Sequence, residues 1–379
     1  MYSVFLVGFV YPVCAHAFWS VNGLFSKSAA EPLFGSGAID LAGSGAVHMT
    51  GGVAALVGTL ILGPRIGRFY DEDGKPLDEP ATFTPHSTSL QFLGTFCLWF
   101  GWYGFNPGSV LVIASEQAGS VAALVTINTT LGACAGAVSA MFFSSLWDWR
   151  ELGEVSYDVG ATMNGCLTGL VSITAGCATV ETWAAVVIGI FGGLFYILGS
   201  KLLIRLKIDD AVDAIPVHMI GGAWGMISTG LLSAPQLIAN AYSENHNSGW
   251  FYEWSEGSGN FTLIGVQLLA VLFVFAWTFT LMGFWFGVLN FMGWFRVDRL
   301  EEMVGLDVSR HKGPAYEYSA PHDDSVNKLI ERRESKRSLN DSSKRGSKAK
   351  QEGAPPTPDA TAKETNEAGA DSSNNEIEA

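Results

Sequence analysis

The sequence predicts an all-α polytopic membrane protein, and three observations lead to that fold class. Of its 379 residues, 48% are hydrophobic and only 15% are charged, whereas ordinary soluble proteins carry about 25% charged residues. Twelve of the 36 acidic and ten of the 22 basic side chains fall after Ala320, so the preceding 320 residues are poorer still in charge. Long apolar runs and an internal repeat are the other two observations.

Eight apolar runs are long enough to cross a membrane. A helix needs about 20 predominantly apolar residues to span a hydrocarbon core of about 30 Å. Barrel strands would instead be about ten residues long, with apolar and polar positions alternating. The first run lacks a basic leader and a small-residue cleavage site, so we interpret it as a span rather than a signal peptide. The eight predicted spans are 3–23, 42–63, 89–113, 119–146, 158–180, 182–206, 213–233 and 263–294.

Basic residues predict the orientation, because Lys and Arg are enriched in short cytoplasmic loops. One side of the predicted topology has only Lys27. The loop from about 233 to 261, on that same side, has no Lys or Arg. We therefore expect both termini to be cytosolic and this loop to be external. The opposite side carries Arg65, Arg68, Lys75, Arg150, Lys201, Arg205 and Lys207.

Three regions are predicted along the chain. Residues 1–296 form the transmembrane domain, and residues 297–320 form a cytosolic segment after the last span. Residues 321–379 are rich in Ser, Lys, Glu, Asn and Pro and show no apolar periodicity. Such a composition cannot bury a core, so we expect a disordered cytosolic tail.

Two segments 170 residues apart repeat one pattern. An Asp is followed after seven residues by His-Met-x-Gly-Gly and, six residues later, by Thr, starting at Asp40 and again at Asp210. The copies lie on the second and seventh spans, which cross the membrane in opposite directions. An inverted repeat of this kind places a binding site at the midplane between the two halves.

The repeat also predicts a helix count. With a unit of five helices, the third to seventh spans form the second copy, and the first copy requires three further helices before Tyr2. We therefore expect eight spans of a total of eleven, with an incomplete N-terminal half.

The repeat places one histidine in each half near the bilayer centre. Eight helical residues rise about 12 Å, so helices that begin at Asp40 and Asp210 bring His48 and His218 to similar depth from opposite sides. Facing imidazoles can share a proton through a hydrogen bond and still offer a nitrogen to a small polar solute. A histidine that only satisfies a backbone carbonyl is the alternative. For a symmetric pair inside spans, where ionisable groups are costly, we favour function.

The aspartates of the repeat are predicted to be helix caps. A carboxylate at a helix start accepts hydrogen bonds from unpaired amides and complements the helix dipole. We assign this structural role to both Asp40 and Asp210. Asp40 lies on the outer side, so its negative charge can also assist the approach of a cation.

Aromatic and hydroxyl side chains gather near the outer ends of the first and third spans. Trp19 offers a ring face that attracts a cation by about 0.5 to 2 kcal/mol, and Ser109 can accept a hydrogen bond from an N–H donor. Together they could form an outer cation site. For Trp102 and Tyr103 we favour the alternative of an aromatic belt at the membrane interface.

Other classes of function are disfavoured. The net charge of −14 argues against nucleic acid, whose phosphates require a basic face. The five cysteines lie in apolar runs without C-x-x-C spacing, which favours neither a zinc site nor a disulfide scaffold. Neither histidine has a Cys, Asp or Glu at ligand spacing within the spans, so a membrane-embedded metalloenzyme ranks last. No catalytic residue, metal or cofactor is predicted.

The sequence resembles the ammonium transporter (Amt/MEP/Rh) family, most closely its eukaryotic plant-type branch. Four motifs in order carry the resemblance, which runs from Tyr2 to about Tyr318: Tyr11-Pro12-x5-Phe18-Trp19, Asp40-x-Ala42-Gly43-Ser44-x3-His48, Gly101-Trp102-x-Gly104-Phe105-Asn106-x-Gly108-Ser109 and Asp209-Asp210-x7-His218.

The resemblance implies a homotrimer in the plasma membrane with one pore per subunit. His48 and His218 would be the pore histidines and Phe105 part of an aromatic gate. Trp19 and Ser109 would form the outer recruitment site, with Asp40 in support. The segment from Gly305 to Tyr316 resembles the family's cytosolic motif, in which Ser309 would be a regulatory phosphosite at a subunit contact.

The function predicted from the sequence is transport of ammonium or methylammonium as NH4+ or NH3. A bare cation is costly to move through hydrocarbon, and ammonium, unlike potassium, can lose a proton. One alternative is an ammonium sensor with little flux, although the tail lacks a folded output domain. The other is an inactive truncated chain.

Overall fold

All eight apolar runs are helical in the computed structural model, which describes residues 2–71, 73–83, 85, 87–242, 247–311 and 313. The chain divides into two units, Met1–Arg299 and Leu300–Ala379. In the first unit the runs correspond, in chain order, to α1 (Tyr2–Phe5), η1 (Leu6–Val10) and α2 (Tyr11–Trp19), then η3 (Ser44–Met49) with α3 (Thr50–Leu62), α4 (Thr88–Phe105), α5 (Glu116–Leu152), α6 (Val159–Ile173), α7 (Thr182–Arg205), η5 (Ile215–Ile220) with α8 (Gly221–Leu232), and α11 (Thr262–Phe291).

Six of these helical segments are long and apolar enough to cross a membrane: Tyr2–Trp19, Ser44–Leu62, Glu116–Glu151, Thr182–Arg205, Ile215–Leu232 and Thr262–Phe291. The other two predicted spans are helical but do not reach both limits. α6 ends at Ile173 and continues as turns, and α4 contains Trp, Tyr, Gly and Gln residues that lower its hydropathy. The prediction of an all-α polytopic membrane fold is confirmed.

Local sequence explains where several helices begin. Ser87, Ser115 and Asp158 each accept a hydrogen bond from an amide in the first turn of α4, α5 and α6, as expected of residues at the N-cap position. In the first helix, Pro12 follows the π-helical turn η1. Proline lacks an N–H group and crowds the carbonyl four residues earlier, which accounts for the widened turn.

Three neighbouring helices pack through glycines spaced four residues apart. α5, α6 and α7 each carry a Gly-x3-Gly pair, at 132/136, 165/169 and 189/193. A Cβ added to Gly136 would lie 2.4 Å from the carbonyl oxygen of Gly165, and one added to Gly193 would lie 2.6 Å from that of Gly136. Small residues allow membrane helices to approach this closely. Each of the three helices therefore packs tightly against the other two.

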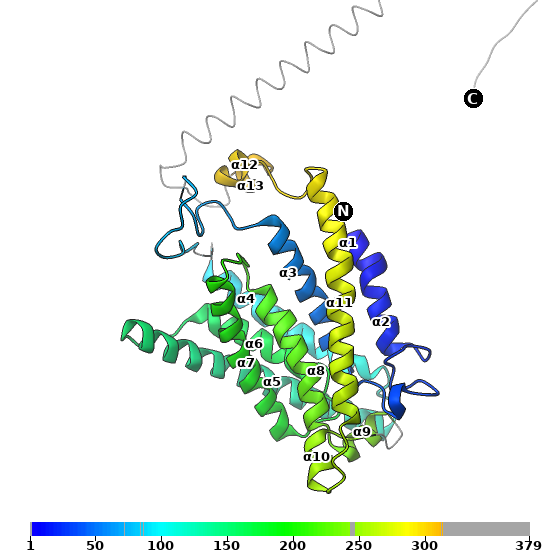
Figure 1. The fold of residues 1–379 in the computed structure, drawn as a ribbon. Helices are drawn as coiled ribbons and strands as arrows, with labels where there is room; N and C mark the ends of the chain where they lie inside the picture. The colour runs from blue at the N-terminus through cyan, green and yellow to red at the C-terminus, as the bar shows by residue number, and fades with distance from the viewer. Residues whose placement is uncertain are drawn as a thin grey trace, which may run out of the picture. The chain divides into compact units, whose positions relative to one another are not determined.

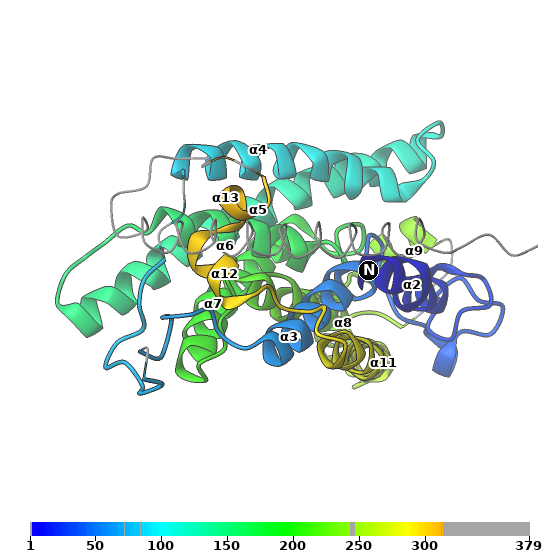
Figure 2. The same ribbon diagram turned by 90° about the horizontal axis from the view of Figure 1, so that it is seen from above.

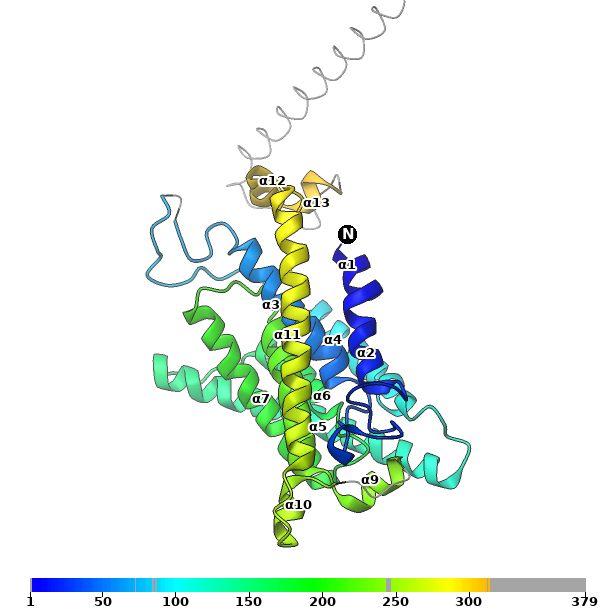
Figure 3. The same ribbon diagram turned by 45° about the vertical axis from the view of Figure 1, so that its right-hand side comes forward.

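α5 is longer than a membrane is thick. Its 37 residues correspond to about 55 Å, and Figures 1 and 3 show it running obliquely to α11. Figure 2 shows α4 and α11 at opposite edges of the bundle. Two short helices, α9 (Pro235–Tyr242) and α10 (Trp250–Ser255), lie between α8 and α11, where the sequence predicted only a loop.

The start of α1 and the end of α11 lie at the same end of the bundle, and α9 and α10 lie at the other (Figure 1). α3 and α8, the helices of the internal repeat, run in opposite directions. In the second unit, α12 (Arg299–Val304) begins at the boundary and α13 (Leu306–Ser309) follows. The predicted disordered tail, residues 321–379, lies outside the described residues.

Candidate functional site

The two histidines of the repeat lie side by side, each in a π-helical turn. His48 belongs to η3 and His218 to η5, and an α-helix follows each turn directly. Their ring centroids are 5.3 Å apart and the ring planes are 11° from parallel. π-Helical turns are rare and frequent at functional sites. The sequence thus predicted the pairing, but not the widened turns that present both rings.

The predicted hydrogen bond between the histidines is not made. The rings are nearly parallel, and among the described residues neither His48 Nε2 nor His218 Nδ1 has a hydrogen-bond partner although both atoms are buried. The site therefore contains two buried imidazole nitrogens without a protein partner, an arrangement that calls for a further polar group.

Trp102 extends the stack and corrects an expectation. Its indole lies 5.1 Å from the His48 ring at 13°, is only 7% exposed, and donates from Nε1 to Thr174 Oγ1 at 3.1 Å. The interpretation of Trp102 as a residue of an interfacial belt is wrong, because the part of α4 that carries it packs against α6 and η3. Tyr103 also bonds within the protein, to Thr130 at 2.7 Å.

Phe105 closes the aromatic group around His48. Its ring centroid lies 5.6 Å from that of His48 and 5.7 Å from that of Trp102, and it is tilted against both. The side chain is 37% exposed. Phe105 thus joins the histidine stack to the accessible surface, a position suited to the predicted gate.

A polar frame behind the aromatic group was not identified from the sequence. The buried Asn106 side chain donates to Thr129 Oγ1 at 3.0 Å and accepts from Thr174 Oγ1 at 3.3 Å. Thr174 in turn accepts from the Trp102 indole. This chain of hydrogen bonds fixes the plane of the Trp102 ring. Asn106 follows the aromatic run of α4. A polar residue inside an apolar span is the sequence feature that could have identified it.

Asp40 is a fully buried cap. Its carboxylate accepts from the amides of Gly43, Gly45 and Ala46 at 3.1, 3.0 and 2.9 Å. Burial raises the pKa of Asp40 to about 6, and these amide hydrogen bonds oppose the rise. The carboxylate therefore stabilises the first turn of η3, and its oxygens are occupied by these amides rather than by a solute.

Trp19 is tied to Asp40 through the backbone. Its indole N–H donates to the Asp40 carbonyl at 2.7 Å, while 43% of the side chain stays exposed. Gln267, fully buried in α11, accepts from the amide of Ile39 at 3.1 Å and donates to its carbonyl at 2.8 Å. The loop that holds the Trp19 ring is thereby fixed at two adjacent residues.

Ser109 lies one turn beyond Phe105. Its hydroxyl donates to the Phe105 carbonyl at 2.8 Å, and the residue is half-buried. Among the described residues no hydrogen bond joins Ser109 to Trp19. The two halves of the predicted outer site are therefore both accessible, but each is held by its own local contacts.

Asp210 occupies the position of Asp40 in the second copy with fewer contacts. Its carboxylate accepts from Ile215 N at 2.6 Å and from Val212 N at 3.4 Å. Its neighbour Asp209 pairs with Arg65 through two side-chain contacts of 2.8 Å. Burial alone would raise the pKa of Asp209, but Arg65 outweighs it and lowers the pKa. The sequence missed this ion pair between the loops.

The glycines after each histidine allow the two half-helices to cross at contact distance. A Cβ on Gly52 would lie 2.1 Å from Met219 N, and one on Gly222 would lie 2.5 Å from the Ser44 carbonyl oxygen and 3.0 Å from Met49 N. Each copy thus presents a glycine to the backbone of the other. This reciprocal contact brings the histidine rings together.

Ser309 belongs to the second unit. It ends α13, and its amide donates to the Gly305 carbonyl at 3.0 Å. The adjacent Arg310 pairs with Glu301 at 2.7 Å. Lys312 lies outside the described residues.

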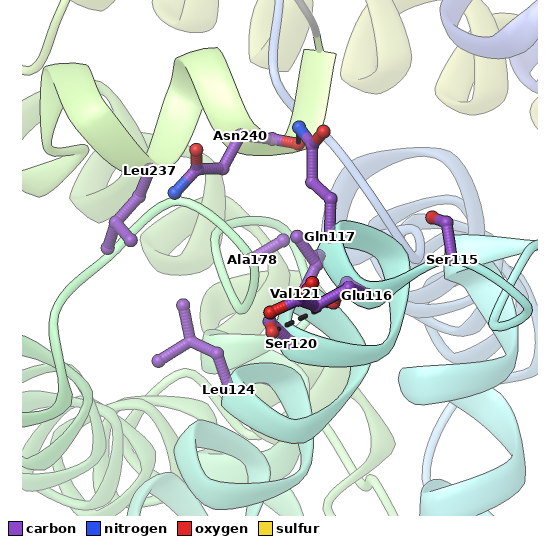
Figure 4. A pocket seen from close by; sticks show the side chains of 9 residues that line it. All are labelled: Ser115, Glu116, Gln117, Ser120, Val121, Leu124, Ala178, Leu237 and Asn240. Carbon is purple, nitrogen blue, oxygen red and sulfur yellow. Dashed lines mark hydrogen bonds between the residues drawn. The ribbon is translucent and has the colours of Figure 1, made fainter.

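A separate hollow of about 750 Å³ opens between the start of α5 and α9 (Figure 4). Glu116, Gln117 and Asn240 line it, and Gln117 donates to the Asn240 carbonyl at 2.9 Å. None of the predicted site residues contributes to its wall. In the described part of the chain, no three His, Cys, Asp or Glu side chains form a group that could hold a metal.

Sequence comparisons relate the chain to transporters. A model described as "Ammonium Transporter Family" matches residues 1–316. Ammonium transporter 1 member 2 of Arabidopsis thaliana is 41% identical over 334 residues, which cover 85% of this chain and 62% of that relative. Ammonium transporter 1 member 1 of Solanum lycopersicum is 39% identical over 326 residues, covering 83% and 64%. The chain thus spans less than two thirds of the length of these relatives.

Solved structures share the fold. A structure named "Sensor Amt Protein" aligns with a TM-score of 0.63 and 31% identity over 81% of this chain and 68% of that chain. Candida albicans Mep2 aligns with a TM-score of 0.62 and 29% identity over 77% and 57%.

The crossing geometry predicts that alanine substitutions at the adjacent Gly51 and Gly52 differ sharply in their effect on stability. Gly52→Ala places a methyl group against the backbone of Met219, so we expect separation of the half-helices and a lower melting temperature in detergent. Gly51→Ala is the matched control, since a Cβ there meets no atom within 4 Å. Thermal unfolding of both purified variants tests this. Equal melting temperatures would contradict the contact at Gly52.

Proposed function

The chain belongs to the ammonium transporter family, and on that premise we propose that it moves ammonium across a membrane along a path past His48 and His218. The observation that carries the proposal is the pair of stacked imidazoles with buried nitrogens that lack a protein partner. An imidazole nitrogen can accept an N–H hydrogen bond or donate one. A solute with several N–H groups, such as ammonium or methylammonium, fits that need.

The path we propose begins at the accessible Trp19 ring and at Ser109, which recruit the cation. Asp40 supports this step through its negative charge and through its backbone carbonyl, which accepts a hydrogen bond from the Trp19 indole N–H. Phe105 acts as the gate that excludes water. The two histidines then receive the hydrogen bonds of the solute and relay its proton, which reduces the cost of carrying a charge through hydrocarbon. Asp210 remains a structural cap.

The cellular setting is also part of the proposal. The chain is a multi-pass membrane protein, and we propose that it lies in the plasma membrane with its C-terminus in the cytosol, because the short basic loops cluster on one side. We further propose a homotrimer in the lipid bilayer. No enzymatic activity, cofactor or nucleic-acid partner is included.

A sensor is the second candidate, and the observation that favours it is the likeness to a structure named as a sensor. The two functions differ in flux. A transporter supports uptake of labelled methylammonium into cells that lack their own ammonium transporters, whereas a sensor binds the solute with little uptake. Binding without uptake would favour the sensor over the transporter.

The first prediction from the path concerns the histidines. His48→Ala or His218→Ala should lower ammonium flux about 10-fold, or weaken its preference over potassium, because the solute loses a buried hydrogen-bond partner worth about 1 to 3 kcal/mol. The measurement is current in cells that express each variant at equal surface abundance. His16→Ala, on α2, serves as the control. Wild-type current and selectivity in both single variants would refute the path.

The second prediction concerns recruitment. Trp19→Leu should raise the half-saturating ammonium concentration about 2- to 30-fold, since about 0.5 to 2 kcal/mol of cation–π attraction is lost. Trp19→Phe keeps a ring face but removes the indole N–H, so it separates attraction of the cation from anchoring of Asp40. Trp254→Leu, on the exposed face of α10, is the control. A concentration dependence like that of wild type in Trp19→Leu would contradict the outer site.

The third prediction is that Ser309 is a regulatory switch. A phosphate there adds about −1.5 to −2 charge and would compete with Glu301 for Arg310. Ser309→Asp should therefore lower flux at unchanged surface abundance, and Ser309→Ala should not. In trimers that combine wild-type and Ser309→Asp subunits, flux should fall by more than the fraction of Ser309→Asp subunits. Flux proportional to the number of wild-type subunits would argue against coupling between subunits.

A further inference from the structure

The loop between α3 and α4 carries an exposed hydroxyl next to two arginines. The backbone amide of Ala81 donates to the Arg68 carbonyl at 2.9 Å, and the Arg68 guanidinium donates back to the Ala81 carbonyl. The Arg65 guanidinium lies over the Phe83 ring, 4.6 Å from its centroid. Thr82 lies between Ala81 and Phe83 and is exposed. Each of the two residues that flank this hydroxyl is therefore in contact with a guanidinium.

The same two arginines contact a buried carboxylate. Arg65 pairs with Asp209 at 2.8 Å, and Arg68 lies 3.5 Å from the same group, whose side chain is only 2% exposed. The backbone amide of Arg65 also donates to this carboxylate at 2.8 Å. These contacts tie the α3–α4 loop to the segment between α7 and η5. That segment leads into the turn that carries His218.

One hollow brings the hydroxyl and the ion pairs together. It has a volume of about 440 Å³, and Thr82, both arginines and Asp209 line it. Asp210 and Asp213 line it as well. Its wall thus holds three carboxylates and two guanidiniums. A further anionic group in this hollow would therefore compete with Asp209 for the arginines.

We propose that Thr82 is a phosphorylation site whose phosphate replaces Asp209 as the partner of Arg65 and Arg68. In this reaction the threonine Oγ1 forms a bond to the γ-phosphorus of ATP, the bond from that phosphorus to the bridging oxygen of ADP breaks, and the hydroxyl proton is released. The phosphate carries about −1.5 to −2 charge, and its oxygens match the fork of a guanidinium. The loop lies on the side that we place in the cytosol, where a protein kinase and ATP have access.

The exchange of partners releases the segment before η5. A buried carboxylate without its partner is costly, and the phosphate repels it, so the segment shifts until Asp209 reaches water. Lys207 and Asp213 in this segment both have a φ of 56°, a conformation that residues other than glycine rarely adopt. Its release also displaces Asp210, the cap of η5. Phosphorylation therefore lowers flux past His218, a step that rests on the proposed function.

Hydrogen exchange in the detergent-purified full chain tests the exchange of partners without a measurement of flux. With phosphothreonine genetically encoded at position 82, the backbone amides of residues 207–213 should exchange about 10-fold faster, because a charge-assisted contact is lost. The control is phosphoserine at Ser156, which is exposed between α5 and α6 and contacts Asp148 rather than an arginine. It should leave these amides unchanged. Unaltered exchange with phosphothreonine, or equal acceleration by the control, would overturn the proposal.

Two variants test which groups exchange partners. In Asp209→Asn the competing carboxylate is absent, so phosphothreonine at position 82 should add no further acceleration. In Arg68→Gln the phosphate loses one guanidinium, so the acceleration should shrink. Full acceleration in both variants would overturn the proposal.

Uptake of labelled methylammonium into proteoliposomes made with the same phosphorylated protein tests the effect on flux. Uptake should fall relative to the unmodified chain, whereas Thr82→Ala should transport like wild type. Accelerated exchange together with unchanged uptake would support the exchange of partners at Thr82 but contradict the transport path past His218, so the two proposals fail separately.

Discussion

The close crossing of two half-helices is the constraint on which the site depends. Gly52 lies against the backbone at Met219, and Gly222 lies against the backbone at Ser44 and Met49. Helices at contact distance leave no room for side chains between them at the crossing. The residues just beside it, His48 and His218, therefore lie next to each other and stack. The inverted repeat thus brings two copies of one short motif together from opposite sides.

Irregular backbone at membrane depth requires polar partners, because no water is present to satisfy it. Buried side chains supply them here. Ser44 donates to the Val171 carbonyl and accepts from the Ala175 amide, both at 2.7 Å. Asn128 donates to the carbonyls of Cys177 and Val180 at 2.9 and 2.8 Å. These bonds hold the turns after α6 against η3 and α5, and so fix the support for the Trp102 ring.

The groups around His48 satisfy one another. Trp102 donates to Thr174, and Asn106 bonds to Thr129 and Thr174. His48 Nε2 and His218 Nδ1 stand outside this network, because these buried nitrogens have no hydrogen-bond partner among the described residues.

The sequence alone determined the helices, the capping role of two aspartates and the pairing of the two histidines. Apolar run length, the cap residues Asp40 and Asp210, and the spacing of the repeat can all be read without a structure. Tertiary structure decided the burial of Trp102, the near-parallel arrangement of the two histidine rings and the ion pair between Arg65 and Asp209. Helical periodicity fixes which residues share a face, but not which distant segment covers that face. Trp102 and Thr174 are 72 residues apart, and only the packing of α4 against α6 brings them together.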